Sequence, residues 1–122
     1  MLACACLTLP ACQDKKKANT PEAVTEQFAK AFYTADFTHM YQYVNKPSNV
    51  VVETLQNSMK DRPEKLEEMR KQEVEFVEIA VESQTDSTAV CSCTAKINGQ
   101  QRTDKWDLVQ ENGNWKVTMV MP

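Results

Sequence analysis

The chain has 122 residues, of which 42% are hydrophobic and 25% are charged, and its formal net charge is -3. This length is typical of one globular domain, not several. Acidic and basic residues nearly balance and form no basic stripe, which argues against nucleic-acid binding. With one histidine and five cysteines, most of them near the start of the chain, a structural zinc set is also not expected. We predict neither a metal nor another cofactor.

The chain opens with an apolar run, residues 2–11, which ends in Leu9-Pro10-Ala11 before Cys12 and the polar segment 13–17. The run is too short to span a bilayer, which needs roughly 20 residues, and suits the apolar region of a signal peptide. The small residue followed by cysteine resembles the lipobox of bacterial lipoproteins, in which the signal segment is cut before a lipidated cysteine. We predict a signal segment over residues 1–11, lacking some upstream residues, and a tether over 12–19 that begins at lipidated Cys12.

The lipobox resemblance places the protein in the bacterial cell envelope, with the membrane as a partner through lipid on Cys12. Each buried methylene of such lipid would contribute about 0.8 kcal/mol. Gln13 after the cysteine is typical of delivery to the outer membrane. The alternative is an apolar arm on a cytosolic protein, with Cys12 an ordinary thiol. The lysines at 15–17 are interpreted as part of a solvated tether; contact with anionic head groups is the alternative.

Three helices are expected in the first half of the domain, capped by Thr20, Asp36 and Ser48 in turn. Pro63 removes one amide donor and should kink or split the third helix. The β-branched run 50–52 allows a short strand instead. Each helix carries apolar residues at helical spacing. These stripes are Val24, Phe28, Ala31, Phe32 and Ala35; Phe37, Met40, Tyr41 and Val44; and Val52, Leu55, Met59, Leu66 and Met69.

From Glu73 onward the apolar period changes to two, which indicates strands. Both glycines lie in Asn-Gly pairs, Asn98-Gly99 and Asn112-Gly113, the strongest short-range signal for a tight hairpin. Two-residue loops at both places give registers that build one apolar face, and a slip of one residue would invert every side chain. The cross-strand sets on this face are Ala89, Leu108 and Val117, then Cys91, Trp106 and Met119.

A further strand precedes these, joined by a loop at Thr85-Asp86-Ser87 that sets Val81 opposite Cys91. The apolar phase switches between Phe76 and Val77, which predicts a β-bulge. The sequence therefore predicts an α+β domain over residues 20–122, with three N-terminal helices packed on one face of a curved four-stranded antiparallel meander. Cys91 and Cys93 are expected to be buried apolar residues, because a disulfide between them would be strained.

Two segments carry a resemblance to a known family: Phe32-Tyr33-Thr34-Ala35-Asp36-Phe37 and Trp106-Asp107-Leu108-Val109 with the terminal Asn112-Gly113-Asn114-Trp115-Lys116-Val117. They resemble the nuclear-transport-factor-2-like (NTF2-like, or cystatin-like) superfamily, and most closely its small bacterial lipoproteins with a domain of unknown function. The resemblance covers residues 20–121. It implies a cone-shaped pocket between sheet and helix. Some members, such as ketosteroid isomerases and polyketide cyclases, transfer protons there through an Asp or His, and others only bind ligands or partners.

Asp104 and Arg102 are the first candidate site residues, because the predicted register points both toward the covered face at its end. Burial would raise the pKa of Asp104 and suit it to act as a base. The interpretation that we favour is a rim ion pair between the two. His39 is a candidate proton shuttle, with a plain surface helix residue as the favoured alternative.

Three aromatic residues complete the candidates. Tyr41 would offer a hydroxyl at a pocket mouth or pack at the edge of the core, and Trp106 would line a cavity or fill it. Trp115 would cap the core or form an exposed contact. No catalytic set is recognisable, so we predict a non-enzymatic domain that binds a small apolar ligand or an envelope protein. The alternatives are a pocket enzyme of the ketosteroid-isomerase or polyketide-cyclase type and a structural module marked by an apolar patch around Trp115.

Overall fold

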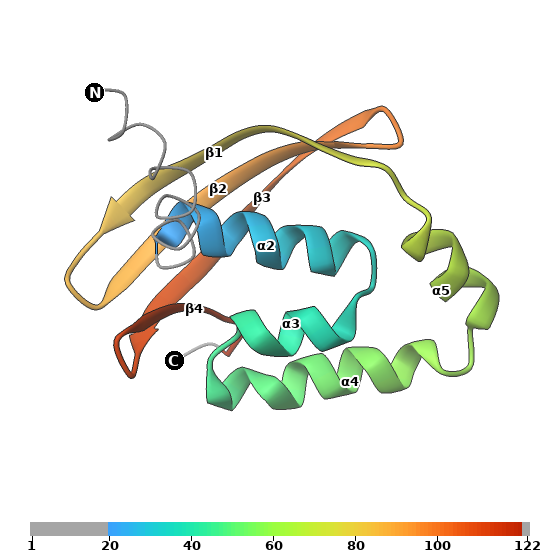
Figure 1. The fold of residues 1–122 in the computed structure, drawn as a ribbon, viewed down its shortest axis with the longest axis horizontal. Coiled ribbons are helices and arrows are strands. Elements are labelled where there is room, and N and C mark those ends of the chain that lie inside the picture. Colours follow the sequence, from blue (N-terminus) through green and yellow to red (C-terminus); the bar gives the residue numbers. More distant parts are fainter. Residues whose placement is uncertain (1–19, 121–122) are drawn as a thin grey trace, which may run out of the picture.

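The computed structural model describes residues 20–120, and the predictions for the signal segment, Cys12 and the tether lie outside them (Figure 1). The helical elements are α2 (Pro21–Tyr33), α3 (Phe37–Tyr43), the short 3-10 helix η1 (Lys46–Ser48), α4 (Asn49–Met59) and α5 (Pro63–Arg70). The strands are β1 (Val74–Gln84), β2 (Thr88–Ile97), β3 (Gln100–Glu111) and β4 (Asn114–Thr118). Within this part of the chain, no helix is both long and apolar enough to cross a membrane.

The helix boundaries follow the predicted caps at two of three positions. Thr20 accepts a hydrogen bond from the Ala23 amide at 3.1 Å, and Asp36 accepts one from the His39 amide at 3.3 Å. The cap predicted at Ser48 is wrong: Ser48 precedes α4, but its hydroxyl donates to Asn45 and accepts from the Met119 amide instead. The third predicted helix is split into α4 and α5, and α5 begins at Pro63 as the missing amide donor requires. Residues 50–52 are helical.

The sheet is an antiparallel meander in the order β1-β2-β3-β4, so the α+β prediction is confirmed. Cys91 pairs with Trp106 on one side and Val81 on the other, as the turns predicted. The β-bulge appears between Phe76 and Glu78, and a second irregularity follows Val81. The predicted pairing of Trp106 with Met119 is not formed.

The end of β4 explains this missing pair. The strand stops at Thr118, opposite Asp107. The next amide, that of Met119, donates to the hydroxyl of Ser48 at 2.7 Å and so leaves the sheet. The same hydroxyl that fails to cap α4 therefore ends the last strand.

The predicted packing of the N-terminal helices on one face of the sheet is confirmed, and the helices differ in how directly they contact the strands. Helix α2 lies along the inner face of the sheet, and α3 packs against α2 and touches β4 (Figure 1). Helix α4 packs on α3, and α5 follows from α4. The sheet thus contacts α2 and α3 most directly, while α4 lies outside α3 and α5 lies beyond the end of α2 (Figure 1). Half-buried Leu66 and Met69 of α5 still reach the main core.

Aromatic rings fill the space between α2 and the sheet. Phe28 is fully buried, and its ring centroid lies 4.9 Å from that of Trp106 in an edge-to-face arrangement. The ring of Phe32 stacks beside that of Phe28 at 5.9 Å and also lies edge-to-face to Trp106 at 5.2 Å. Cys91 and Cys93 are free and fully buried beneath them, as predicted. Trp106 therefore packs in the core rather than lining an empty cone.

Candidate functional site

A cleft of about 440 Å³ opens where the end of α2, helix α5 and the β2–β3 hairpin meet. Its apolar wall consists of Phe32, Met69 and Ile97. Two cationic side chains, Lys65 and Arg102, contribute to the lining, which contains no carboxylate. The remaining lining residues are Tyr33, Gln72, Asn98, Gln100 and Gln101. The cleft thus combines an apolar wall with amide and cationic groups.

One side of the cleft is organised by Tyr33, Asp104 and Arg102. The Tyr33 side chain is buried at the end of α2, and its hydroxyl donates to Oδ2 of Asp104 on β3. Arg102 donates to the same carboxylate twice, from Nε to Oδ2 at 2.8 Å and from Nη2 to Oδ1 at 3.0 Å. Its guanidinium also lies 5.1 Å from the centre of the Tyr33 ring. The favoured prediction of an ion pair between Arg102 and Asp104 is confirmed.

Tyr33 is the member of this group that sequence reasoning missed. The available signal was a second stripe on α2, because Ala29 and Tyr33 are four residues apart and share a helix face. Both are buried in a second apolar cluster with Cys93, Ala95 and Ile97. Gln72, just after α5, donates to the backbone carbonyl of Tyr33 and ties this end of α2 to the chain beyond α5.

The electrostatics of the group oppose the predicted role of Asp104 as a base. Partial burial pushes the pKa of Asp104 upward, but the hydrogen bonds from Arg102 and Tyr33 outweigh it and hold the pKa below its usual range. Burial, reinforced by the bond to Asp104, raises the pKa of Tyr33. The expectation that the pKa of Asp104 is raised overall is therefore wrong, although burial acts in the expected direction. A carboxylate stabilised by two donor side chains is a weak proton acceptor.

The chemical consequence is an oriented cation. Arg102 keeps two of its donor nitrogens on Asp104, which fixes the plane of the guanidinium at the cleft. The side chain is 51% exposed, so the rest of the guanidinium faces solvent or a bound molecule. Lys65 approaches from α5 and has no ion pair with any residue in 20–120. The cleft can therefore hold a polar or acidic group next to an apolar wall.

The structure separates the other candidates from this cleft. His39 lies in α3, and its Nδ1 is 2.6 Å from the Asp36 carboxylate that caps the helix. Tyr41 donates from its hydroxyl to Gln56 at 3.2 Å and so links α3 to α4. Both contacts are solvent-exposed. They match the structural alternatives considered for these residues.

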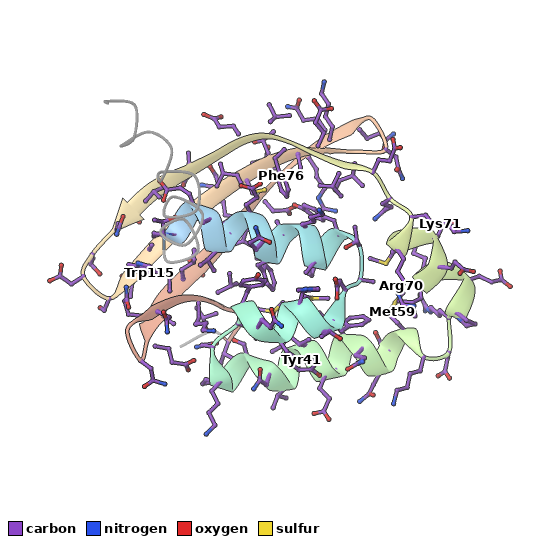
Figure 2. All side chains as sticks on the ribbon, in the orientation of Figure 1. Tyr41, Met59, Arg70, Lys71, Phe76 and Trp115 are labelled. Atoms are coloured by element: carbon purple, nitrogen blue, oxygen red, sulfur yellow. The ribbon has the colours of Figure 1, made fainter. Side chains whose placement is uncertain are left out.

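Trp115 marks the opposite end of the molecule. Figure 2 shows it near the start of α2, far from Arg70 on α5. Its side chain is buried in the main apolar cluster with Leu108 and Val117. It therefore caps the core rather than forming an exposed contact.

A second hollow, of about 620 Å³, lies on the outer face of the sheet beside Val90, Val109 and Val120. It is more aliphatic than the cleft, but one of its walls is Val120, where the described residues end. Among residues 20–120, no three His, Cys, Asp or Glu side chains are placed to hold a metal ion. The cleft at Arg102 is the better-defined candidate site.

Comparison with protein families and with curated proteins finds no family model and no protein that matches the chain. The likeness to the NTF2-like superfamily thus rests on the residues quoted above and stays a prediction.

Proposed function

We propose that this protein is a lipid-anchored, non-enzymatic protein of the bacterial envelope, whose α+β domain binds a small ligand in the cleft between α2, α5 and the β2–β3 hairpin.

 The observation that carries this proposal is the joining of an apolar wall to a cation of fixed orientation in one cleft. Its volume of about 440 Å³ falls in the usual range for small-molecule sites.

The lining favours a particular chemistry of ligand. Phe32, Met69 and Ile97 suit the hydrocarbon part of a small molecule, and Lys65 and Arg102 suit a polar or acidic group on the same molecule. Because the lining holds no carboxylate, it would not repel such a group. We therefore propose a small amphiphile rather than a purely apolar compound.

The pocket-enzyme alternative would require Asp104 to accept a proton from a substrate. Its lowered pKa weakens it as a base. His39, the other titratable candidate, lies on α3 and does not line the cleft. These two observations support a binding role over proton transfer.

The binding proposal is tested by native mass spectrometry of residues 18–122 after incubation with an extract of bacterial envelope. A discrete added mass is expected, and Lys65→Glu should reduce its occupancy. Lys71→Glu is the matched control, since Lys71 follows α5 and does not line the cleft (Figure 2). A bare protein mass, or equal loss in both variants, would contradict ligand binding at this cleft.

The anchoring proposal needs a separate experiment. In the full chain, Cys12→Ser should move the protein from the membrane fraction to the soluble fraction. Cys6→Ser is the control, because that residue lies within the predicted signal segment and would be removed. Membrane association that survives Cys12→Ser would show that Cys12 is not the anchor.

A further inference from the structure

One half of strand β3 has an open edge. Strand β4 pairs only with residues 107–111, so residues 100–106 have β2 on one side and, within the described part of the chain, no strand on the other. In Figure 1, β3 continues past the end of β4 toward the β2–β3 hairpin. Residues 100–103 and Lys105 are exposed, which fits an uncovered edge.

The direction of the free backbone groups follows from the turn. In a two-residue hairpin the flanking pair, Ile97 and Gln100, is hydrogen-bonded. In an antiparallel ladder the bonded residues alternate, so the N–H and C=O groups of Gln101, Thr103 and Lys105 point away from β2. Asp107, two residues beyond Lys105, likewise points away from β2 and pairs with Thr118 on β4. Three successive outward-facing positions thus form a template for another strand.

We propose that a second copy of this chain pairs with this edge, β3 against β3 in antiparallel orientation, about a two-fold axis at Thr103. Thr103 is the central residue of the open stretch 100–106. The arrangement sets Gln101 opposite the partner's Lys105, and Arg102 opposite the partner's Asp104. Both copies contribute the same surface, as a two-fold interface requires. The outward backbone groups then form about six hydrogen bonds.

Charge selects this register over its neighbours. The nearest registers with the same hydrogen-bond pattern shift the partner by two residues. They set Arg102 directly opposite the partner's Arg102, or Asp104 opposite the partner's Asp104, and like charges directly opposite are destabilising. Only the register centred on Thr103 both uses the whole open stretch and places opposite charges together.

Charge also favours a second copy over an unrelated strand. Charged side chains that point inward from an edge normally discourage pairing with other chains. Arg102 and Asp104 pair with each other within one chain. An unrelated strand would seldom match both charges, whereas a second copy sets each of them opposite its complement. The other edge of the sheet, β1, carries two irregularities that break a regular ladder.

The test is sedimentation of residues 18–122 from about 10 μM to about 1 mM, the range suited to a small interface. A reversible dimer is expected. In the Gln101→Glu variant, each copy gains an ion pair with the partner's Lys105, which should lower the dissociation constant of the dimer about fivefold. Gln101→Lys places like charges together and should raise the dissociation constant about fivefold. These exposed substitutions leave the sheet of the single copy unchanged.

A second pair of variants separates the edge from the rest of the sheet. Thr103 and Thr94 share a hydroxyl contact at 2.9 Å on the outer face. Thr103→Glu removes this contact and places two carboxylates together at the two-fold axis, so the dimer should be lost. Thr94→Glu removes the same contact from β2 and should leave the dimer intact. A monomer throughout the concentration range, or a dimer indifferent to residues 101 and 103, would overturn the proposal.

Discussion

The two halves of β3 have the same alternation of side chains but different surroundings. In residues 107–111, the inward residue Leu108 is 1% exposed, and β4 covers the strand edge. In residues 100–106, the inward side chains include Arg102 and Asp104, and the edge is open. One half closes the core, and the other forms the wall of a cleft. The comparison shows that the alternation of side chains along the strand decides which face of the sheet a residue occupies. The neighbouring helices and strands decide whether that position is buried from solvent.

The largest difference between the halves is expected in stability. Leu108→Ala should lower the free energy of unfolding by about 3 kcal/mol, because it leaves a cavity in the closed half. Arg102→Ala, on the same face in the open half, should cost less than about 1 kcal/mol, since exposed ion pairs contribute little. Urea unfolding of residues 18–122 measures both. Equal losses would mean that the open half is packed as firmly as the closed half.

The next effect concerns the bond that holds the open half to α2. Tyr33→Phe removes the donor to Asp104 and should cost about 1–2 kcal/mol, because hydrogen bonds to charged groups are among the stronger ones. Tyr41→Phe is the matched control, since it removes an exposed hydroxyl bonded to Gln56. The same urea titration should show a smaller change for the control. A larger change for Tyr41→Phe would refute the importance of the Tyr33 contact.

The two turns sharpen the comparison because they should respond alike. Gly99 and Gly113 have φ values of 85° and 82°, and a Cβ at either would meet no atom within 4 Å. Replacement of either by alanine should therefore cost about 1 kcal/mol through backbone strain alone. Thermal unfolding of the two variants tests this. A markedly larger loss at one turn would show that its half of the sheet depends on more than turn conformation.

The smallest expected effect is on the pH dependence of stability. The pKa of Asp104 is lowered in the folded state, so the carboxylate stabilises the fold above its unfolded pKa of about 3.9. This contribution is lost as the pH falls from there through the lowered folded value. Asp104→Asn should therefore flatten the acid limb of the urea midpoint plotted against pH. An acid limb identical in the variant would show that Asp104 does not contribute to it.

The sheet could be predicted closely because its signals are local. Each Asn-Gly turn sets one strand register, and the alternation of apolar and polar residues on both sides of the turn tests it. The pairing of Cys91 with Trp106 could therefore be predicted without knowledge of the helices. The exception, Met119, was lost to a distant hydroxyl, that of Ser48. No local pattern reports such a contact.

The cleft was harder to predict, because its parts come from three separate regions. The pair of Arg102 and Asp104 was found since both lie on one strand face. Tyr33 was missed because only the crossing of α2 over β3 brings its hydroxyl to Asp104. Lys65 reaches the same cleft only because the break before Pro63 lets α5 turn toward the hairpin.

By itself, the sequence determined the order of helices and strands, the turns, the registers and the face on which each strand residue lies. Those features depend on periodicity and on turn chemistry, which act over a few residues. Only the tertiary structure decided that Trp115 is buried, that Asp104 is a stabilised carboxylate and that half of β3 is uncovered. These depend on which elements meet across the fold, because burial and electrostatic environment are set by neighbours distant along the chain.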